Sequence, residues 1–98
     1  MASEKLLERT FAEKLNATKK VWCIKLPANF VAGLPDRVVF CKGGYVGFAE
    51  IKTTGQKPRP IQLIIHKKLE ALGFRVFIVD SHEARDEAID FFLNKVNE

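Results

Sequence analysis

The stretch GLPDRVVFCKGGYVGFAEIK, residues 33–52, decides how the rest of the chain folds. It reads as two strands, Arg37 to Cys41 and Tyr45 to Lys52, joined by the turn Lys42-Gly43-Gly44. A pair of glycines between two apolar runs is a strong hairpin signal, because hairpin turns need backbone conformations that glycine adopts readily. Asp36 opens the first strand, so the hairpin begins with a carboxylate.

The register of this hairpin decides whether two acidic side chains meet. A two-residue Gly-Gly loop would place Asp36 opposite Ile51, and Asp36 and Glu50 would then face opposite sides of the sheet. A three-residue loop would pair Cys41 with Tyr45 instead. Asp36 would then lie directly opposite Glu50 on one face, with Cβ atoms about 4.5 to 5.5 Å apart. We predict the three-residue register, or a bulge of equivalent effect, because carboxylates at that distance can share one cation.

The face that carries the acids is expected to be an apolar core face that runs out into solvent. Side chains alternate along a strand, so Glu50 and Lys52 point the same way while Ile51 points away. A bare pair of carboxylates at such a partly dry edge would have raised pKa values, and a bound cation would relieve this. The apolar residues expected on this face are Val38, Phe40, Val46 and Phe48.

The segments around the hairpin predict one small α/β domain over residues 1–98. A helix between the hairpin and the last strand implies that this strand runs parallel to an earlier one, so we expect a mixed sheet flanked by helices. The expected elements before the hairpin are a helix over residues 3–17 with Ser3 as N-cap, a strand over 21–26 and a loop over 27–35. After the hairpin we expect a loop over 53–60, a helix from 60 or 61 to a cap at Gly73, a strand over 74–79, and a last helix capped by Asp80 or Ser81.

Basic residues near the hairpin have two interpretations. Lys25 lies in an apolar strand, where a lysine usually protects a sheet edge from aggregation, but beside a phosphate site it could contact DNA. The loop over residues 53–60, TTGQKPRP, contains Lys57 and Arg59 and follows the second acid at once. Its glycine and prolines are typical of a solvated linker, while its position favours a phosphate-contacting loop. Both interpretations of this loop remain open.

The helix after this loop is expected to bury an apolar stripe. Gln62 and His66 lie one turn apart on a different side, where we expect exposed side chains. The stripe consists of Ile61, Ile64, Ile65, Leu69 and Leu72.

Composition limits the partners and the compartment. The chain has 98 residues with 16 Lys+Arg against 12 Asp+Glu, and this excess of +4 is compatible with a polyanionic partner. Cys23 and Cys41 form no CxxC pair, so we expect buried free thiols in a reducing compartment. No apolar run approaches the roughly 20 residues that span a membrane, so we expect a soluble, intracellular protein.

Asp36, Glu50 and Lys52 are the residue types that phosphodiester hydrolysis requires. A hard divalent ion held by carboxylates can activate a water molecule and stabilise charge on phosphorus and on the leaving oxygen. Oxygen ligands favour Mg²⁺ or Mn²⁺ over Zn²⁺, because the His and Cys residues lack metal-ligand spacing. A lysine on the same face can touch the scissile phosphate or orient the water. Alone, the pattern D(x)n-E-x-K is weak, because many sequences match it by chance.

The combined motifs resemble the PD-(D/E)XK nuclease superfamily, and most closely the stand-alone VRR-Nuc domains of phages and bacteria. The resemblance covers nearly the whole chain. The motifs that carry it are Gly33-Leu34-Pro35-Asp36-Arg37, Phe48-Ala49-Glu50-Ile51-Lys52, Gln62 at the start of a helix, and the run Leu69…Leu72-Gly73-Phe74-Arg75-Val76.

The resemblance implies a restriction-endonuclease-like αβββαβα core and metal-dependent nuclease activity. Asp36 and Glu50 would bind Mg²⁺ or Mn²⁺ together with the backbone carbonyl of Ile51. Lys52 would contact the phosphate or the water, and Gln62 would support the site from its helix.

The resemblance also places an acid in the first helix and implies partners. Glu4 is the chosen acid and would be a further metal ligand, although Glu8 fits the same spacing. Small members of the family resemble Holliday-junction resolvases and act as homodimers, which implies branched DNA as substrate in a bacterial cell or phage-infected host. The alternative is a DNA-binding module of the same fold with little or no nuclease activity. The candidate DNA contacts are Lys25, Arg37, Lys57 and Arg59.

Overall fold

Three helices and four strands follow one another in the expected order in this computed structural model, which describes residues 3–27 and 29–96. They are α1 (Glu4–Asn16), β1 (Val21–Lys25), β2 (Arg37–Cys41), β3 (Val46–Ile51), α2 (Pro60–Ala71), β4 (Arg75–Val79) and α3 (His82–Val96). The strands form one sheet in the order β1-β2-β3-β4. The β1–β2 and β2–β3 pairs are antiparallel and the β3–β4 pair is parallel, so the predicted mixed α/β sheet is confirmed.

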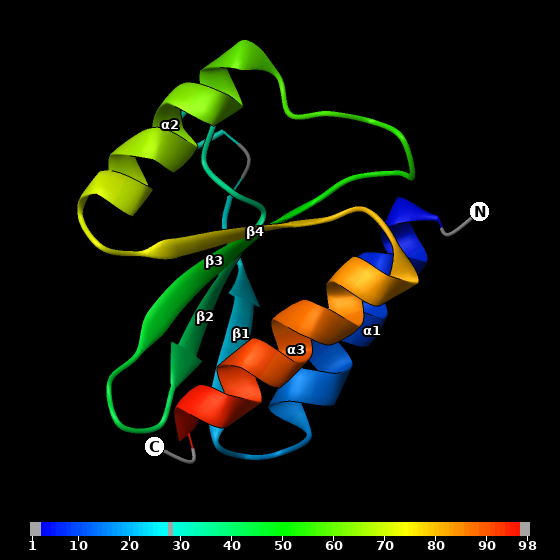
Figure 1. Ribbon diagram of the computed structural model, residues 1–98, viewed down its shortest axis with the longest axis vertical. Coiled ribbons are helices and arrows are strands. Elements are labelled where there is room, and N and C mark those ends of the chain that lie inside the picture. Colours follow the sequence, from blue (N-terminus) through cyan, green and yellow to red (C-terminus); the bar gives the residue numbers. More distant parts are fainter. Residues whose placement is uncertain (1–2, 28, 97–98) are drawn as a thin grey trace.

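The sheet lies between two unequal layers of helix. Helices α1 and α3 pack side by side against one face, whereas α2 stands alone on the other and packs mainly on β4 (Figure 1). Ser3 caps α1 as predicted, because its Oγ accepts a hydrogen bond of 3.1 Å from the amide of Leu6. None of the helices in the described parts of the chain is long and apolar enough to cross a membrane.

The main core lies between the sheet and the pair α1 and α3. Phe11 and Phe92 meet edge to face in it, with ring centroids 6.4 Å apart. Gly47 lets α3 approach closely, since a Cβ at this position would come within 2.5 Å of the Phe92 ring. The buried core residues are Leu7, Phe11, Ala12, Leu15, Val21, Cys23, Val39, Cys41, Ala49, Ile51, Val79, Ala88, Ile89 and Phe92.

The acids share the predicted apolar face of the hairpin, but the main core lies on the opposite face. Val38, Phe40, Val46 and Phe48 point toward the single helix α2, and this helix covers only part of their face. Val38 is buried there, but Phe40 is 39% exposed beside Trp22, which is 62% exposed. Both faces of the hairpin are apolar, and the face that receives two helices becomes the main core.

The predicted three-residue register of the hairpin is confirmed. Arg37 pairs with Ala49 and Phe40 pairs with Val46, which places Asp36 opposite Glu50. The turn between the strands closes with a hydrogen bond of 3.0 Å from the amide of Gly44 to the carbonyl of Cys41. Gly43 and Gly44 both have a φ of 99°, a left-handed conformation that strains residues with a side chain. The two acids consequently project from neighbouring strands on the face that α2 covers.

Candidate functional site

Asp36 and Glu50 form a cross-strand acid pair at the end of the β2–β3 hairpin. Asp36 is held by the chain itself, because its Oδ2 accepts a hydrogen bond of 2.7 Å from the amide of Ile51. Glu50 is only 1% exposed. Its Oε2 accepts a hydrogen bond of 2.7 Å from Gln62 and lies 3.4 Å from the Lys52 ammonium. Its Oε1 is buried without a hydrogen-bond partner among the described residues.

The electrostatics of this pair favour a bound cation. Burial, followed by the negative charge of Asp36, raises the pKa of Glu50 to about 7, although Lys52 and Gln62 oppose this. Burial also raises the pKa of Asp36, while the amide of Ile51 opposes the shift. Lys52 therefore compensates the pair only in part. A divalent cation would keep both carboxylates ionised.

Helix α2 turns a polar side toward these acids. Gln62 bridges two elements, since its Oε1 accepts the amide of Arg59 at 2.7 Å while its Nε2 donates to Glu50. His66, one turn later, is 5% exposed, and its Nε2 lies 3.9 Å from Oε1 of Glu50. The expectation that Gln62 and His66 are exposed is therefore wrong.

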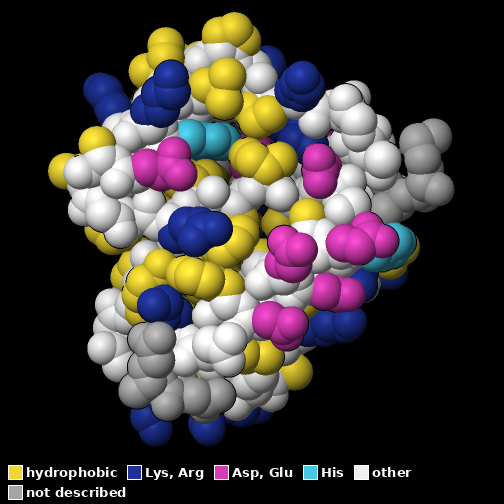
Figure 2. All heavy atoms as spheres, in the orientation of Figure 1, with side chains coloured by type: hydrophobic (Ala, Val, Ile, Leu, Met, Phe, Trp, Pro, Cys, Tyr) yellow, Lys and Arg dark blue, Asp and Glu magenta, His cyan; other side chains and the backbone are white. Residues whose placement is uncertain are grey.

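The predicted apolar stripe of α2 points largely the other way. Hydrophobic side chains gather on the outer surface of the molecule over α2, at the top of Figure 2. The helix lies beside the ionisable end of the hairpin, so its polar side is the one that finds partners inside. The exposed apolar residues of this helix and of the turn after it are Ile61, Leu63, Ile64 and Leu72.

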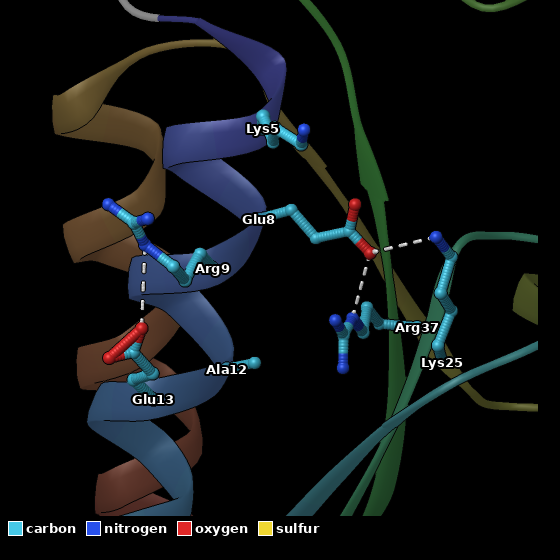
Figure 3. A pocket seen from close by; sticks show the side chains of 7 residues that line it. All are labelled: Lys5, Glu8, Arg9, Ala12, Glu13, Lys25 and Arg37. Carbon is cyan, nitrogen blue, oxygen red and sulfur yellow. Dashed lines mark hydrogen bonds and ion pairs between the residues drawn. The ribbon is translucent and has the colours of Figure 1, made fainter.

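The first helix brings Glu8, rather than Glu4, toward the acid pair. Glu8 accepts a hydrogen bond of 3.0 Å from Nε of Arg37 and lies 4.0 Å from the ammonium of Lys25 (Figure 3). Its charge contributes to the raised pKa of Asp36. Glu4 is exposed in the first turn of α1. The structure thus favours the alternative first-helix acid over the one chosen from the resemblance.

A basic pocket of about 290 Å³ adjoins Glu8 on the side of α1 and β1 (Figure 3). Within it, Arg9 pairs with Glu13 at 3.5 Å, and Arg37 and Lys25 share Glu8. Four basic residues against two acidic ones leave this pocket positively charged. It is lined by Lys5, Glu8, Arg9, Ala12, Glu13, Lys25 and Arg37.

The remaining predicted DNA contacts lie on the loop that connects β3 to α2. Lys57 and Arg59 are both exposed there, between Lys52 and Gln62 in the sequence. The hydroxyl of Thr54 donates a hydrogen bond of 3.1 Å to the carbonyl of Asp80, which ties the loop to the end of β4. The loop is therefore anchored through Thr54 and exposes two basic side chains just before α2.

The donor set fits a hard divalent ion that keeps several water ligands. In the described parts of the chain, no three His, Cys, Asp or Glu side chains are gathered closely enough to hold a metal by themselves. The acid pair instead offers two carboxylates. Oε1 of Glu50 has no hydrogen-bond partner among the described residues, so it can coordinate a cation. Mg²⁺ is commonly bound through one or two carboxylates and waters rather than by an all-protein cage.

The fold and the acid pair define a class, the small α/β domains of nuclease type. The chain is similar to a solved structure described as "VRR_NUC domain", with a TM-score of 0.80 and 28% identity over 93% of this chain and 99% of that chain. The resemblance to VRR-Nuc domains that the sequence predicts is therefore confirmed, and the chain has the VRR-Nuc fold.

A phage protein is similar over part of the chain. The "Putative nuclease p44" of Acyrthosiphon pisum secondary endosymbiont phage 1 is 45% identical over 51 residues. These residues are 52% of this chain and 55% of the phage protein, so the match spans about half the length of that relative. No family model matches the chain.

Proposed function

We propose that this protein is a DNA endonuclease that hydrolyses phosphodiester bonds with Mg²⁺ or Mn²⁺. The observation that carries the proposal is the acid pair, Asp36 opposite Glu50, with Lys52 on the same face. A buried glutamate with a pKa raised to about 7 and an unpartnered oxygen is costly for a fold of this size. A cation site explains why the chain keeps it.

Each residue of the site has a distinct role in this proposal. Asp36, Glu50 and the backbone carbonyl of Ile51 would hold the divalent ion, which supplies Lewis-acid stabilisation of the phosphate and an activated water. Lys52 would contact the scissile phosphate or orient the attacking water. Gln62 fixes Glu50 through its hydrogen bond of 2.7 Å, so it acts on the carboxylate rather than on the substrate.

Glu8 would complete the acidic end of the site from α1. It is held between Arg37 and Lys25, so its carboxylate is oriented but already partly neutralised. We therefore assign it to the hydrogen bonding of a water in the site rather than to direct ligation. Glu4 has no such placement.

DNA would approach from the basic side of the molecule. The pocket around Lys5, Arg9, Lys25 and Arg37 adjoins Glu8, whose charge acts on Asp36, and would accept a flanking phosphate. Acidic side chains cluster over α3 instead, at the right of Figure 2, and would repel a phosphate backbone. Lys57 and Arg59, on the exposed loop before α2, would contact the strand on the other side of the site.

We further propose that the protein works as a homodimer on branched DNA, in a bacterial cell or a phage-infected host. Trp22 and Phe40 lie exposed on the half of the sheet that α2 does not cover, with ring centroids 5.8 Å apart. On the same side, α2 exposes Ile61 and Ile64. These two surfaces can pair about a two-fold axis. The exposed apolar side of α2 in each copy would cover the exposed sheet around Trp22 and Phe40 in the other.

A size measurement in solution tests this surface. Sedimentation of the wild type should give a dimer, and Trp22→Ser combined with Ile64→Lys should give a monomer. Leu6→Lys is the matched control, since Leu6 is an exposed apolar residue of α1, on the other side of the sheet. A monomeric wild type would remove the dimer from the proposal, and with it the symmetrical cutting of a junction.

The activity is tested with a four-way junction and a linear duplex, each incubated with Mg²⁺, Mn²⁺ or EDTA. We expect metal-dependent cutting, stronger on the junction, that Lys52→Ala lowers by roughly 10²- to 10³-fold. Lys42→Ala is the control for loss of a positive charge, because Lys42 is exposed in the hairpin turn, at the other end of β2 and β3 from the acid pair. Binding without cutting under any divalent ion would support the alternative, a DNA-binding module.

A further inference from the structure

Two buried polar atoms face each other beside the site without a partner. They are Nε2 of His66 on α2 and Oε1 of Glu50 on β3, and among the described residues neither makes a hydrogen bond. The two atoms are 3.9 Å apart, which is too far for a direct hydrogen bond. A buried polar group left unsatisfied costs about 1–3 kcal/mol, so this gap needs an explanation.

The short contacts of the Glu50 carboxylate lie on its other oxygen, away from the gap. The other carboxylate oxygen, Oε2 of Glu50, is already engaged by Gln62 and Lys52. Nε2 of His66 can donate or accept a hydrogen bond, depending on the tautomer of the imidazole. A water molecule about 2.8 Å from each atom would satisfy both of them.

We propose that His66 is a positioning residue of the ion site, and that its Nε2 hydrogen-bonds a water ligand of the divalent ion bound at Glu50. This inference rests on the proposed function, because it assumes that the acid pair binds a divalent ion. A water is preferred over direct ligation, since no three metal-ligating side chains are gathered around one point in the described residues. Groups that orient the ligands of an ion in this way contribute roughly 10- to 100-fold to its affinity.

Three variants of the 98-residue chain separate this role from packing. His66→Gln keeps a polar atom at the end of a side chain of similar reach, and His66→Leu removes it. His82→Leu is the matched control, because His82 is the other histidine of the chain and is exposed at the start of α3. Circular dichroism and thermal melting establish which variants fold.

Binding of Mn²⁺, measured by isothermal titration calorimetry, is the readout, so cutting activity is not needed. We expect His66→Leu to weaken Mn²⁺ binding by roughly 10- to 100-fold. His66→Gln should stay close to the wild type, and His82→Leu should equal it. In electron paramagnetic resonance, Mn²⁺ bound to the wild type should show no directly coordinated nitrogen.

Different outcomes overturn different claims. Wild-type affinity in folded His66→Leu would overturn the role of His66 while leaving the proposed function intact. A directly coordinated nitrogen would overturn the role of the water. If His66→Leu does not fold, His66→Gln decides, because a large loss of affinity in that folded variant contradicts the proposal. A wild type that binds no Mn²⁺, or a Glu50→Gln variant that binds as well as the wild type, would overturn the proposed function itself.

Discussion

Gln62 holds Glu50 by a hydrogen bond of 2.7 Å from Nε2 to Oε2, and its own Oε1 accepts the amide of Arg59 at 2.7 Å. One side chain thus connects the start of α2 to the buried acid on β3. This arrangement fixes the orientation of the Glu50 carboxylate and leaves its second oxygen available. The start of α2 and the acidic end of the hairpin are therefore one structural unit.

Replacement of Gln62 by alanine should damage this unit in two ways. Oε2 of Glu50 would lose a buried donor, so we expect a loss of about 1–3 kcal/mol in the free energy of unfolding. The carboxylate would also lose its orientation, and we expect a roughly 10- to 100-fold fall in metal affinity. Urea denaturation and calorimetric titration measure the two effects. Gln56→Ala, at an exposed glutamine of the loop, should change neither; equal losses in both variants would contradict this role.

Glu50 should make the stability of the metal-free protein fall as the pH rises. Its pKa is raised from 4.5 to about 7, so between these values the folded state binds more protons than the unfolded state. The contribution of Glu50 to the free energy of unfolding is therefore fully present below pH 4.5 and is lost as the pH rises through about 7. The loss is on the order of 3 kcal/mol. Asp36, whose pKa is also raised, acts in the same direction.

Urea denaturation in EDTA between pH 4.5 and 8 measures this decline. Glu50→Gln should flatten the profile, because the amide does not ionise. Mg²⁺ or Mn²⁺ should restore stability to the wild type at pH 8 but not to the variant. A wild type whose stability rises over this range would refute the buried, raised-pKa description of Glu50.

The hairpin register could be predicted because it depends on local chemistry. Gly43 and Gly44 supply the positive φ values of a three-residue turn, and that turn length alone sets Asp36 against Glu50. The orientation of α2 could not be predicted in the same way. Periodicity assumes that a helix buries its apolar side, but here Glu50, twelve positions before Gln62, draws the polar side inward.

Hydrophobic periodicity also fails to predict the exposure of Phe40. Both faces of the hairpin alternate with apolar residues, so periodicity cannot tell which face receives α1 and α3. That choice depends on how the helices cross the sheet, and it buries Val39 while leaving Phe40 exposed. The assignment of the first-helix acid depends on the same packing, because Glu4 and Glu8 lie one turn apart on one side of α1.

Substitution of the two first-helix acids should separate their roles. Glu8→Gln would remove the partner of Arg37 and Lys25, and we expect cutting to fall by roughly 10-fold or more. The stability change should stay below about 1 kcal/mol, because partly exposed ion pairs contribute little. Glu4→Gln should leave the rate unchanged. A larger loss in Glu4→Gln than in Glu8→Gln would reverse the assignment, as measured by single-turnover cleavage.

Lengthening the turn by one residue should abolish ion binding, even where a hairpin still forms. With one glycine inserted after Gly44, a three-residue loop of glycines pairs Lys42 with Tyr45, and this shift of one residue moves every side chain of one strand to the other face. Asp36 would then lie opposite Ile51, and the acid pair would be separated. Gly44→Asn is the matched control, because asparagine tolerates positive φ better than other residues with a side chain, and the register is kept. We expect the control to bind Mn²⁺ with near wild-type affinity in calorimetric titration and the insertion variant to bind none. Retained binding in a folded insertion variant with the shifted register would show that the cross-strand pairing of Asp36 and Glu50 is not what creates the site.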